Sequence, residues 1–340
     1  MRKKVVLMFL LLAGCILISG NVFAAWTQAK GHSYNQLTLS YYKTTEKFTT
    51  IEKFPDVEED PKSGDVKNTH VENFRNEEEE FTASKLSYYV EYGVVDDLTV
   101  IFSGGFEYVR SNDILSQTGD SDSVSGVGDI ILGLRQKISN NVAGGPMSVQ
   151  LDIKVPEAYN YEDPVNNQNL GDGQYDATLK LKYGRGFSKG YAVLDAGYKY
   201  RFENEQLDPY TFKPSDAVIV SLSGGYNAAP WLSIRGKIDW ENSIGNAKVS
   251  NEFVSHAILY GVDEKHGEAV MILDTLGLEK DSLTAGLALA FNVAKNTQLV
   301  ASYDWTLDGI GPFKDWDFGT FRSSNSSIGE TVSLALAYSY

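Results

Sequence analysis

The feature that most constrains the fold of this chain is an alternation of apolar and polar residues, repeated in segments of about ten residues. Within residues 98–108, Val100 and Phe102 fall on one side of an extended strand, whereas Thr99 and Ser103 fall on the other. A strand built in this way needs an apolar environment on one side and water on the other. The period of two therefore predicts a sheet of two-faced strands and argues against a helical protein.

Twelve segments of this kind can be delimited, and their connections alternate in length. We expect strands at residues 34–46, 82–94, 97–109, 125–138, 146–156, 174–186, 190–203, 216–227, 231–242, 282–293, 297–308 and 329–340. The connections after even-numbered strands are short, at residues 95–96, 139–145, 187–189, 228–230 and 294–296. The connections after odd-numbered strands are long, at residues 47–81, 110–124, 157–173, 204–215, 243–281 and 309–328.

This asymmetry is typical of outer-membrane barrels, and a soluble β-sandwich has no reason to show it. In hydrocarbon every backbone N–H and C=O group must be paired within the protein, so a spanning sheet has to close on itself. The sequence therefore predicts an all-β fold, namely a transmembrane antiparallel β-barrel of about 12 strands with short periplasmic turns and long extracellular loops. Aromatic residues near the strand ends, such as Tyr92, Tyr108 and Trp240, suit the two interfacial girdles.

The N-terminal segment has the features of a secretory signal peptide. A basic start is followed by an apolar stretch at residues 5–18 and by small residues at Ala24 and Ala25. We expect cleavage near Ala24 or Ala25, which divides the chain into a signal peptide at residues 1–24 and a barrel at residues 25–340 in the bacterial outer membrane. Residues 12–15 (LAGC) resemble a lipobox, but the apolar stretch continues beyond Cys15 and favours ordinary cleavage.

Composition narrows the chemistry that the processed chain can perform. Cys15 is the single cysteine, so a processed chain would have neither disulfides nor thiolate metal sites. Loss of three N-terminal cations with the signal peptide takes the formal net charge from −15 to −18. Affinity for nucleic acid comes largely from Lys and Arg on phosphates, so we expect no nucleic-acid partner.

If the apolar faces meet lipid, the polar faces line the interior, and their charged residues can be named. The candidate lumen-lining residues of a pore are Lys85, Glu91, Glu107, Asp129, Arg135, Lys137, Asp152, Lys154, Asp176, Lys180, Lys182, Asp195, Lys199, Arg201, Arg235, Lys237, Asp239 and Asp304. The two signs nearly balance, so most of the net negative charge is expected in the loops. Such an interior is either a hydrophilic pore with charged walls or a salt-bridged filling that passes little solute. We favour the pore, although twelve strands do not decide between them.

Two long connections stand out by composition. Residues 47–81 carry many carboxylates, including the run at residues 77–80, and we expect a solvated loop. Divalent cations bridging these carboxylates to lipopolysaccharide are the alternative. Residues 253–277 are less polar than a surface loop should be. That segment either folds over the mouth as a lid or constriction, or forms a hairpin that extends the barrel wall.

Catalytic and metal-binding patterns are weak in this sequence. The four histidines are His32, His70, His256 and His266. None lies on an expected strand with a serine on the same face, and the adjacent pair Ser255 and His256 would point apart on a strand. His256 and His266 lie near two carboxylates with loose spacing. We therefore expect no enzymatic activity, no metal site and no cofactor.

The C-terminal segment alternates as a final strand should, with Val332, Leu334 and Leu336 opposed to small or polar residues and with Tyr340 at its end. It resembles the closing strand that the barrel-assembly machinery reads in outer-membrane proteins. The expected partners are thus outer-membrane lipid and lipopolysaccharide, the barrel-assembly machinery through Tyr340, and a small-molecule solute.

Several strand motifs occur together in a familiar order. Residues 92–99 (YGVVDDLT) resemble a "YG-[VLI]-x-D-x-LT" turn, and residues 126–135 (GVGDIILGLR) resemble a "GxGDxxLGxR" strand. Residues 154–156 (KVP), 171–176 (GDGQYD) and 197–201 (GYKYR) continue the order. Together they are similar to an outer-membrane family of the MetA-pathway phenol-degradation type, over roughly residues 85–230 and more weakly to the end of the chain.

The resemblance implies a barrel that transports small molecules. On that basis we expect an outer-membrane, porin-like channel for uptake of small molecules, with aromatic or apolar compounds as candidates. The matching motifs are turns and strand positions, so they supply no binding residues. The long acidic segment at residues 47–81 departs from the family pattern and leaves the ligand open. The alternative is a non-conducting structural or surface-binding barrel that acts through its loops.

Overall fold

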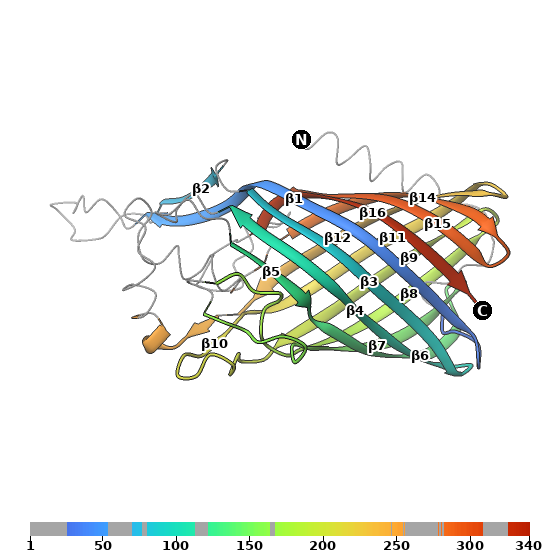
Figure 1. Ribbon diagram of the computed structural model, residues 1–340. Helices are drawn as coiled ribbons and strands as arrows, with labels where there is room; N and C mark the ends of the chain where they lie inside the picture. The colour runs from blue at the N-terminus through green and yellow to red at the C-terminus, as the bar shows by residue number, and fades with distance from the viewer. Residues whose placement is uncertain are drawn as a thin grey trace, which may run out of the picture.

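The computed structural model describes residues 26–53, 70–76, 80–112, 122–163, 167–245, 247–253, 255, 278, 280, 282–308 and 326–340. Within these residues the chain forms a closed antiparallel barrel of 12 strands, as the sequence predicts (Figure 1). In order around the barrel, the wall strands are β1 (Ser33–Lys53), β3 (Glu80–Val95), β4 (Leu98–Asn112), β6 (Ile130–Val142), β7 (Gly145–Val155), β8 (Asp176–Phe187), β9 (Gly190–Arg201), β11 (Asp216–Ala229), β12 (Leu232–Ile244), β14 (Ser282–Ala294), β15 (Thr297–Asp308) and β16 (Ser326–Ser339).

The barrel closes because its first and last strands pair with each other. Leu37 of β1 lies opposite Tyr88 of β3 on one side and opposite Leu336 of β16 on the other. Figure 1 shows the tilted strands joined by short turns at one end, where the C-terminus also lies, and by long connections at the other. We call these the turn end and the loop end. The signal peptide expected at residues 1–24 lies outside the described residues.

The two faces of the wall differ in chemistry. Large apolar side chains point outward, and Leu39, Phe106, Leu179, Leu287 and Val332 are each more than half exposed. A closed sheet with an apolar outer surface is the β-structure that can lie in a bilayer, because its backbone is paired and its side chains meet acyl chains. The described residues hold no helix that is long and apolar enough to cross a membrane.

One expected strand, at residues 125–138, is interrupted. It forms β5 (Asp122–Val127), which pairs with β4, and then β6. Opposite β4, Val127 pairs with Phe106 and Ile131 with Ser103, so the broken strand carries one extra residue. This is a β-bulge at Gly128 and Asp129. Gly128 leaves no room for a side chain, because a Cβ there would lie 2.4 Å from the Glu107 carboxylate.

The connection expected at residues 47–81 is partly a hairpin rather than a loop throughout. The strand β1 continues to Lys53, and β2 (His70–Asn76) pairs with that continuation. Residues 47–53 (KFTTIEK) include residues that favour extended structure, which the charge pattern concealed. Residues 54–69 and 77–79, which hold most of the acidic residues of this connection, lie outside the described residues. Another small sheet, β10 (Phe212–Lys213) with β13 (Lys248–Val249), pairs two further connections.

The connections at the turn end are tight. Two residues join β6 to β7, and both Ala143 and Gly144 have positive φ angles, 49° and 89°. This geometry suits the right-handed twist of an antiparallel pair. The turn is shorter than the expected one at residues 139–145, because β6 continues with irregular pairing to Val142. Glu203 lies beyond the end of β9 and is exposed, so the expected strand at residues 190–203 is two residues too long.

Candidate functional site

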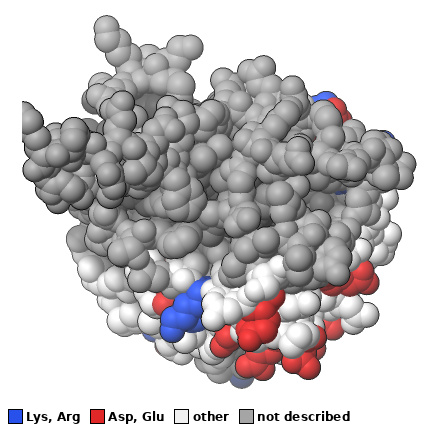
Figure 2. All heavy atoms as spheres, turned by 90° about the vertical axis from the view of Figure 1, so that its left-hand side faces the viewer, with Lys and Arg blue, Asp and Glu red and all other residues white. Residues whose placement is uncertain are grey.

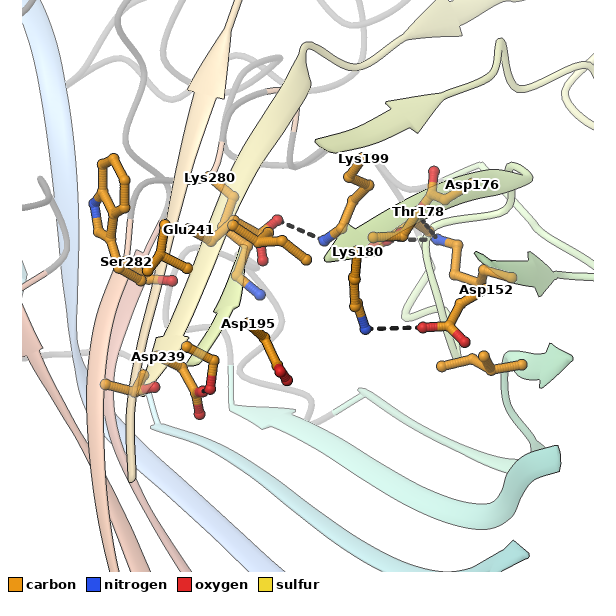
Figure 3. A pocket seen from close by; sticks show the side chains of 18 residues that line it. Asp152, Asp176, Thr178, Lys180, Asp195, Lys199, Asp239, Glu241, Lys280 and Ser282 are labelled. Atoms are coloured by element: carbon orange, nitrogen blue, oxygen red, sulfur yellow. Dashed lines mark hydrogen bonds and ion pairs between the residues drawn. The ribbon is translucent and has the colours of Figure 1, made fainter. Parts of the chain in front are cut away.

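A cavity of about 550 Å³ lies inside the barrel, against the strands from β6 to β14 (Figure 3). Its lining is strongly charged. The acidic residues are Asp152, Asp172, Asp176, Asp195, Asp239 and Glu241, and the basic residues are Lys154, Lys180, Lys199 and Lys280. The cavity also has apolar wall positions, including Ile219 and Val220, and hydroxyl groups such as that of Ser221. Seven of the candidate lumen-lining residues therefore line one continuous space.

Ion pairs organise the wall of this cavity. The Lys180 ammonium on β8 lies 2.8 Å from the Asp152 carboxylate on β7. The Lys199 ammonium on β9 lies 2.6 Å from the Glu241 carboxylate on β12, and this pair reaches across β11 (Figure 3). Alternation places the side chains of neighbouring strands on the inner face at matched heights, so opposite charges can meet without leaving the wall.

At the loop end a second cluster centres on Lys154. Its ammonium lies 2.8 Å from Asp172, 3.0 Å from Asp176 and 3.5 Å from Asp129. The Arg201 guanidinium lies 3.3 Å from Asp172. Partial loss of hydration opposes ionisation of Asp172, whose side chain is 52% exposed, but the Lys154 and Arg201 cations outweigh it and hold the pKa of that carboxyl below its usual range. The cluster therefore ties the connection at residues 156–175 to the wall.

The remaining candidate residues pair outside the cavity lining or along its edge. Lys237 on β12 lies 3.1 Å from Asp304 on β15, across Gly286 of β14, where a side chain would collide with both groups. Lys85 pairs with Glu107, and Lys182 pairs with Asp195. Two further contacts lie toward the turn end, where Arg235 donates to Gln298 and Lys137 pairs with Asp97 of the β3–β4 turn.

A deeply buried polar pair lies near the turn end. The Arg135 guanidinium on β6 lies 2.8 Å from the Glu91 carboxylate on β3. The pair reaches across Thr99 of β4, whose exposure is 0%. Arg135 also donates to Gln150 at 2.8 Å, so each end of the pair has further polar partners.

An apolar cluster covers the loop end above part of the barrel. Three connections contribute to it, and its members are Tyr161, Leu207, Phe212, Phe253 and Leu278. Phe253 and Leu278 flank the segment at residues 253–277, whose interior lies largely outside the described residues. Figure 2 shows the loop end, where acidic side chains gather on the visible part of the rim beside a smaller basic group. The exposed acidic residues of these connections include Glu157, Glu162, Glu203, Glu205, Asp208 and Glu252.

Metal and catalytic groups can be examined among the described residues. There, no group of three or more His, Cys, Asp or Glu side chains is arranged to hold a metal ion. His32 lies at the turn end, where its ring is 2.7 Å from the Tyr340 carbonyl oxygen. His256 and His266 lie outside the described residues.

Sequence reasoning missed several polar groups of the interior. Thr99, Gln150 and Ser221 lie on the polar faces of alternating strands, so the same alternation would have found them had it not been restricted to charged residues. Asp172 and Lys280 come from connections, which carry no period. Gln28 precedes the first strand and nevertheless reaches Glu91, 2.8 Å away.

Comparisons with known proteins agree with this geometry. The model of a family described as "Putative MetA-pathway of phenol degradation" matches residues 69–312, more than half of the chain. No functionally curated protein matches the sequence.

Among solved structures, the COG4313 outer membrane channel from Pseudomonas putida F1 is similar, with a TM-score of 0.59 and 13% identity over 94% of this chain and 100% of that one. The NanC porin has a TM-score of 0.44 and 7% identity over 89% of this chain and 98% of that one. The toluene transporter TodX of P. putida has a TM-score of 0.39 and 9% identity over 90% and 89% of the two chains. The first of these similarities shows the shared barrel fold.

Proposed function

The chain belongs to the family described by the MetA pathway of phenol degradation, and we propose that it is an outer-membrane channel for the uptake of small solutes. The observation that carries the proposal is the charged cavity of about 550 Å³ enclosed by a wall whose outer face is apolar. A barrel that served as a wall alone would gain nothing from ten charged side chains around a space large enough for a small molecule.

The chemistry of the lining bears on the solute. Paired Lys and Asp or Glu side chains offer hydrogen bonds of both kinds, and a wholly apolar molecule would have to displace water from them without replacing its bonds. Small molecules with at least one polar group, phenol-type aromatic compounds among them, fit this cavity better than hydrocarbons do. This narrows the expectation of aromatic or apolar solutes toward the polar aromatic side.

The alternative, a non-conducting barrel, has one observation in its favour. The described lumen charges are held in ion pairs along the wall, such as Lys180 with Asp152 and Lys237 with Asp304, and a salt-bridged interior can serve as filling. Conduction separates the two proposals, because a filled interior passes neither ions nor solutes.

The test is conductance in planar bilayers together with swelling of liposomes in solutes of graded size and polarity. We expect discrete conductance steps and faster entry of a phenol-type alcohol than of a neutral disaccharide. Glu241→Gln should make the channel more selective for anions and Lys199→Gln more selective for cations, because each leaves the opposite charge of the pair unbalanced in the cavity. The reversal potential in a salt gradient measures this selectivity. Lys43→Gln, in an exposed pair outside the cavity lining, is the control. A persistently silent bilayer without swelling would support the non-conducting barrel instead.

The route to the membrane forms part of the same proposal. A signal peptide at residues 1–24 would direct export, and the barrel-assembly machinery would read the C-terminal strand, whose Tyr340 side chain is 70% exposed. Outer-membrane lipid would meet the apolar wall, and lipopolysaccharide would meet the loop end. Fractionation of cells expressing the full chain tests this part, since recovery in the inner membrane or cytosol would contradict it.

A further inference from the structure

One part of the cavity lining combines an apolar side chain with hydrogen-bond acceptors. Ile219 of β11 lines the cavity and lies opposite Gly197 of β9 on one side and Glu241 of β12 on the other. The Ile219 side chain leans over Gly197, where an added Cβ would lie 3.2 Å from its Cγ1 atom. An apolar surface beside a few polar groups is the usual composition of a small-molecule site.

The acceptors nearest to Ile219 form a single row. Asp195 of β9 and Asp239 of β12 lie directly opposite Ser221 of β11, one on each side, and all three line the cavity (Figure 3). Lys199 and Glu241 lie farther along the same strands toward the loop end. A solute that moves from the loop end toward the turn end therefore meets Asp195, Ser221 and Asp239, which we call the carboxylate row.

The carboxylate row carries the excess of negative charge in the cavity. Six carboxylates and four ammonium groups line the cavity, and most of them pair with one another along the wall. Asp195 and Asp239 are the exceptions. Their cationic partners are Lys182 and Lys237, neither of which lines the cavity.

Asp239 is the more open of the two carboxylates. Its Oδ1 atom accepts a hydrogen bond from the Ser221 hydroxyl. The Lys237 ammonium lies 3.6 Å from its Oδ2 atom but only 3.1 Å from Asp304, so one cation is shared between two carboxylates. The Asp239 side chain is 41% exposed. It therefore offers the cavity an accessible acceptor whose charge is only partly balanced.

Asp195 contributes an acceptor that has no donor. Its Oδ2 atom accepts from Lys182, whereas its Oδ1 atom is buried and has no hydrogen-bond partner among the described residues. Burial of an acceptor without a donor is unfavourable, so a donor that reached it would be stabilised. The terminal torsion of a carboxylate is broad, and rotation about it can bring this oxygen toward the cavity.

We propose that Ile219 and the carboxylate row form a subsite for small amphipathic solutes whose polar group donates hydrogen bonds. The apolar part of the solute packs on Ile219, and its ammonium or hydroxyl group donates to Asp239 and Asp195. The same two residues repel a solute that ends in a carboxylate. The inference rests on the proposed function for its consequence in uptake, but binding at the subsite can be tested without conduction.

The first experiment measures charge at the carboxylate row. In a Cys15→Ser background, which has no other cysteine, Ser221→Cys is treated with a cationic and with an anionic methanethiosulfonate, and each rate is divided by that of a free thiol. The cationic reagent should be favoured by about tenfold. Thr178→Cys is the matched control, because it also lines the cavity but lies between Asp152 and Lys199, whose charges are opposite. Its ratio should be near one.

The same measurement identifies the residue that produces the preference. Asp239→Asn, added to Ser221→Cys, should lower the ratio severalfold because it removes the partly balanced charge. Glu80→Gln, in an exposed pair outside the cavity lining, should leave the ratio unchanged. Heat-modifiable gel mobility verifies that each barrel folds.

The second experiment measures binding by protection of Ser221→Cys from uncharged methyl methanethiosulfonate. Benzylamine, benzyl alcohol and benzoate carry the same ring with an ammonium, a hydroxyl or a carboxylate group at pH 7. Half-protection should need about tenfold less benzylamine than benzyl alcohol, and benzoate should not protect. Asp239→Asn should remove the advantage of the amine. Ile219→Ala should weaken protection by both donors by about threefold and keep their order.

The outcomes separate the subsite from the channel. Equal protection by benzoate and benzylamine, or a reagent ratio that Asp239→Asn leaves unchanged, would overturn the subsite. Conductance steps in a protein that neither donor protects would overturn the subsite and leave the channel standing. The expected order of protection in a protein that never conducts would support the subsite and overturn the channel instead.

Discussion

The two ends of the barrel are held together by different physical means. At the turn end, two-residue turns join the wall strands, and a buried network of polar contacts centred on Glu91 and Arg135 holds residues 26–28 against the wall. At the loop end, the apolar cluster around Phe212 and Phe253 joins connections that are far apart in the chain. The cavity lies beside the loop end, whose connections supply Asp172 and Lys280 to its lining.

This difference means that contacts at the turn end should control the stability of the barrel, whereas contacts at the loop end should control access to the cavity. Polar contacts at the turn end join wall strands directly, so their loss should weaken the barrel itself. Apolar packing at the loop end joins connections to one another, so its loss should open the loop end while the wall stays intact. The predictions below set equivalent changes at the two ends against each other.

The largest effect is expected for Arg135→Ala at the turn end. It leaves the Glu91 carboxylate buried without its cation, and breaking a buried pair in this way costs about 3–5 kcal/mol of folding free energy. Urea-induced unfolding in lipid vesicles measures the loss, and Glu91→Gln added to Arg135→Ala should recover part of it. At the loop end, Lys43→Ala breaks a pair whose side chains are 47% and 43% exposed, and we expect a change of at most about 1 kcal/mol. Equal losses of folding free energy for Arg135→Ala and Lys43→Ala would contradict the difference between the two ends.

Phe253→Ala tests the closure at the loop end. Removing this fully buried ring should cost about 3 kcal/mol, near the lower limit for such a truncation because loops can collapse into the space. The cost should appear locally, as faster limited proteolysis of residues 202–215 and 247–253, with the urea midpoint of the barrel nearly unchanged. Glu252→Ala, an exposed neighbour, is the control. A fall in the urea midpoint as large as that of Arg135→Ala would show that the loops support the wall.

The wall strands and the connections also differ in how far the sequence predicts them. The wall strands could be placed because lipid demands apolar residues on one face and the interior tolerates polar ones, so a pattern such as that of β12 leaves little choice. The sequence does not show which inner-face side chains of the wall form ion pairs. Alternation places Lys237 and Asp304 on the inner face, but their contact depends on the register and on Gly286 between them.

The connections carry no comparable signal. Phe212 belongs to one connection and Phe253 and Leu278 to another, and nothing in their local sequence indicates that they pack together. The bulge at Gly128 lies against Glu107 on another strand, a proximity that no local pattern contains. Gln28 lies outside every period, so its contact with Glu91 could not be inferred from the sequence. Sequence patterns do not predict long-range contacts between irregular segments, because such segments have no repeating geometry that links sequence position to a face.

Asp172 provides a smaller test at the loop end. Because Lys154 and Arg201 lower its folded-state pKa, the stability that it contributes is fully present above the unfolded value and is lost as pH falls through the lowered folded value. Protection of residues 167–175 from hydrogen exchange should therefore be the same at pH 7 and pH 5. Asp172→Asn should reduce that protection by about 1 kcal/mol or less, because its side chain is 52% exposed and solvent screens the contact. Asp129, whose pKa is raised by burial, also holds this connection through Tyr159. Loss of protection near pH 5 in the parent but not in Asp172→Asn would therefore contradict the lowered pKa.

The smallest effect comes from a matched pair of glycines. Gly144 at the turn end and Gly245 at the loop end have positive φ angles of 89° and 81°, and neither has an atom closer than 3.8 Å to an added Cβ. Alanine at either position therefore brings backbone strain without collision, at about 1 kcal/mol. Gly144 belongs to the hairpin between two wall strands, so Gly144→Ala should lower the urea midpoint of the barrel. Gly245 follows β12 in a connection, so Gly245→Ala should leave the midpoint unchanged and appear in proteolysis of the loop end alone. Equal shifts in the urea midpoint would mean that the loop end folds as one cooperative unit with the wall.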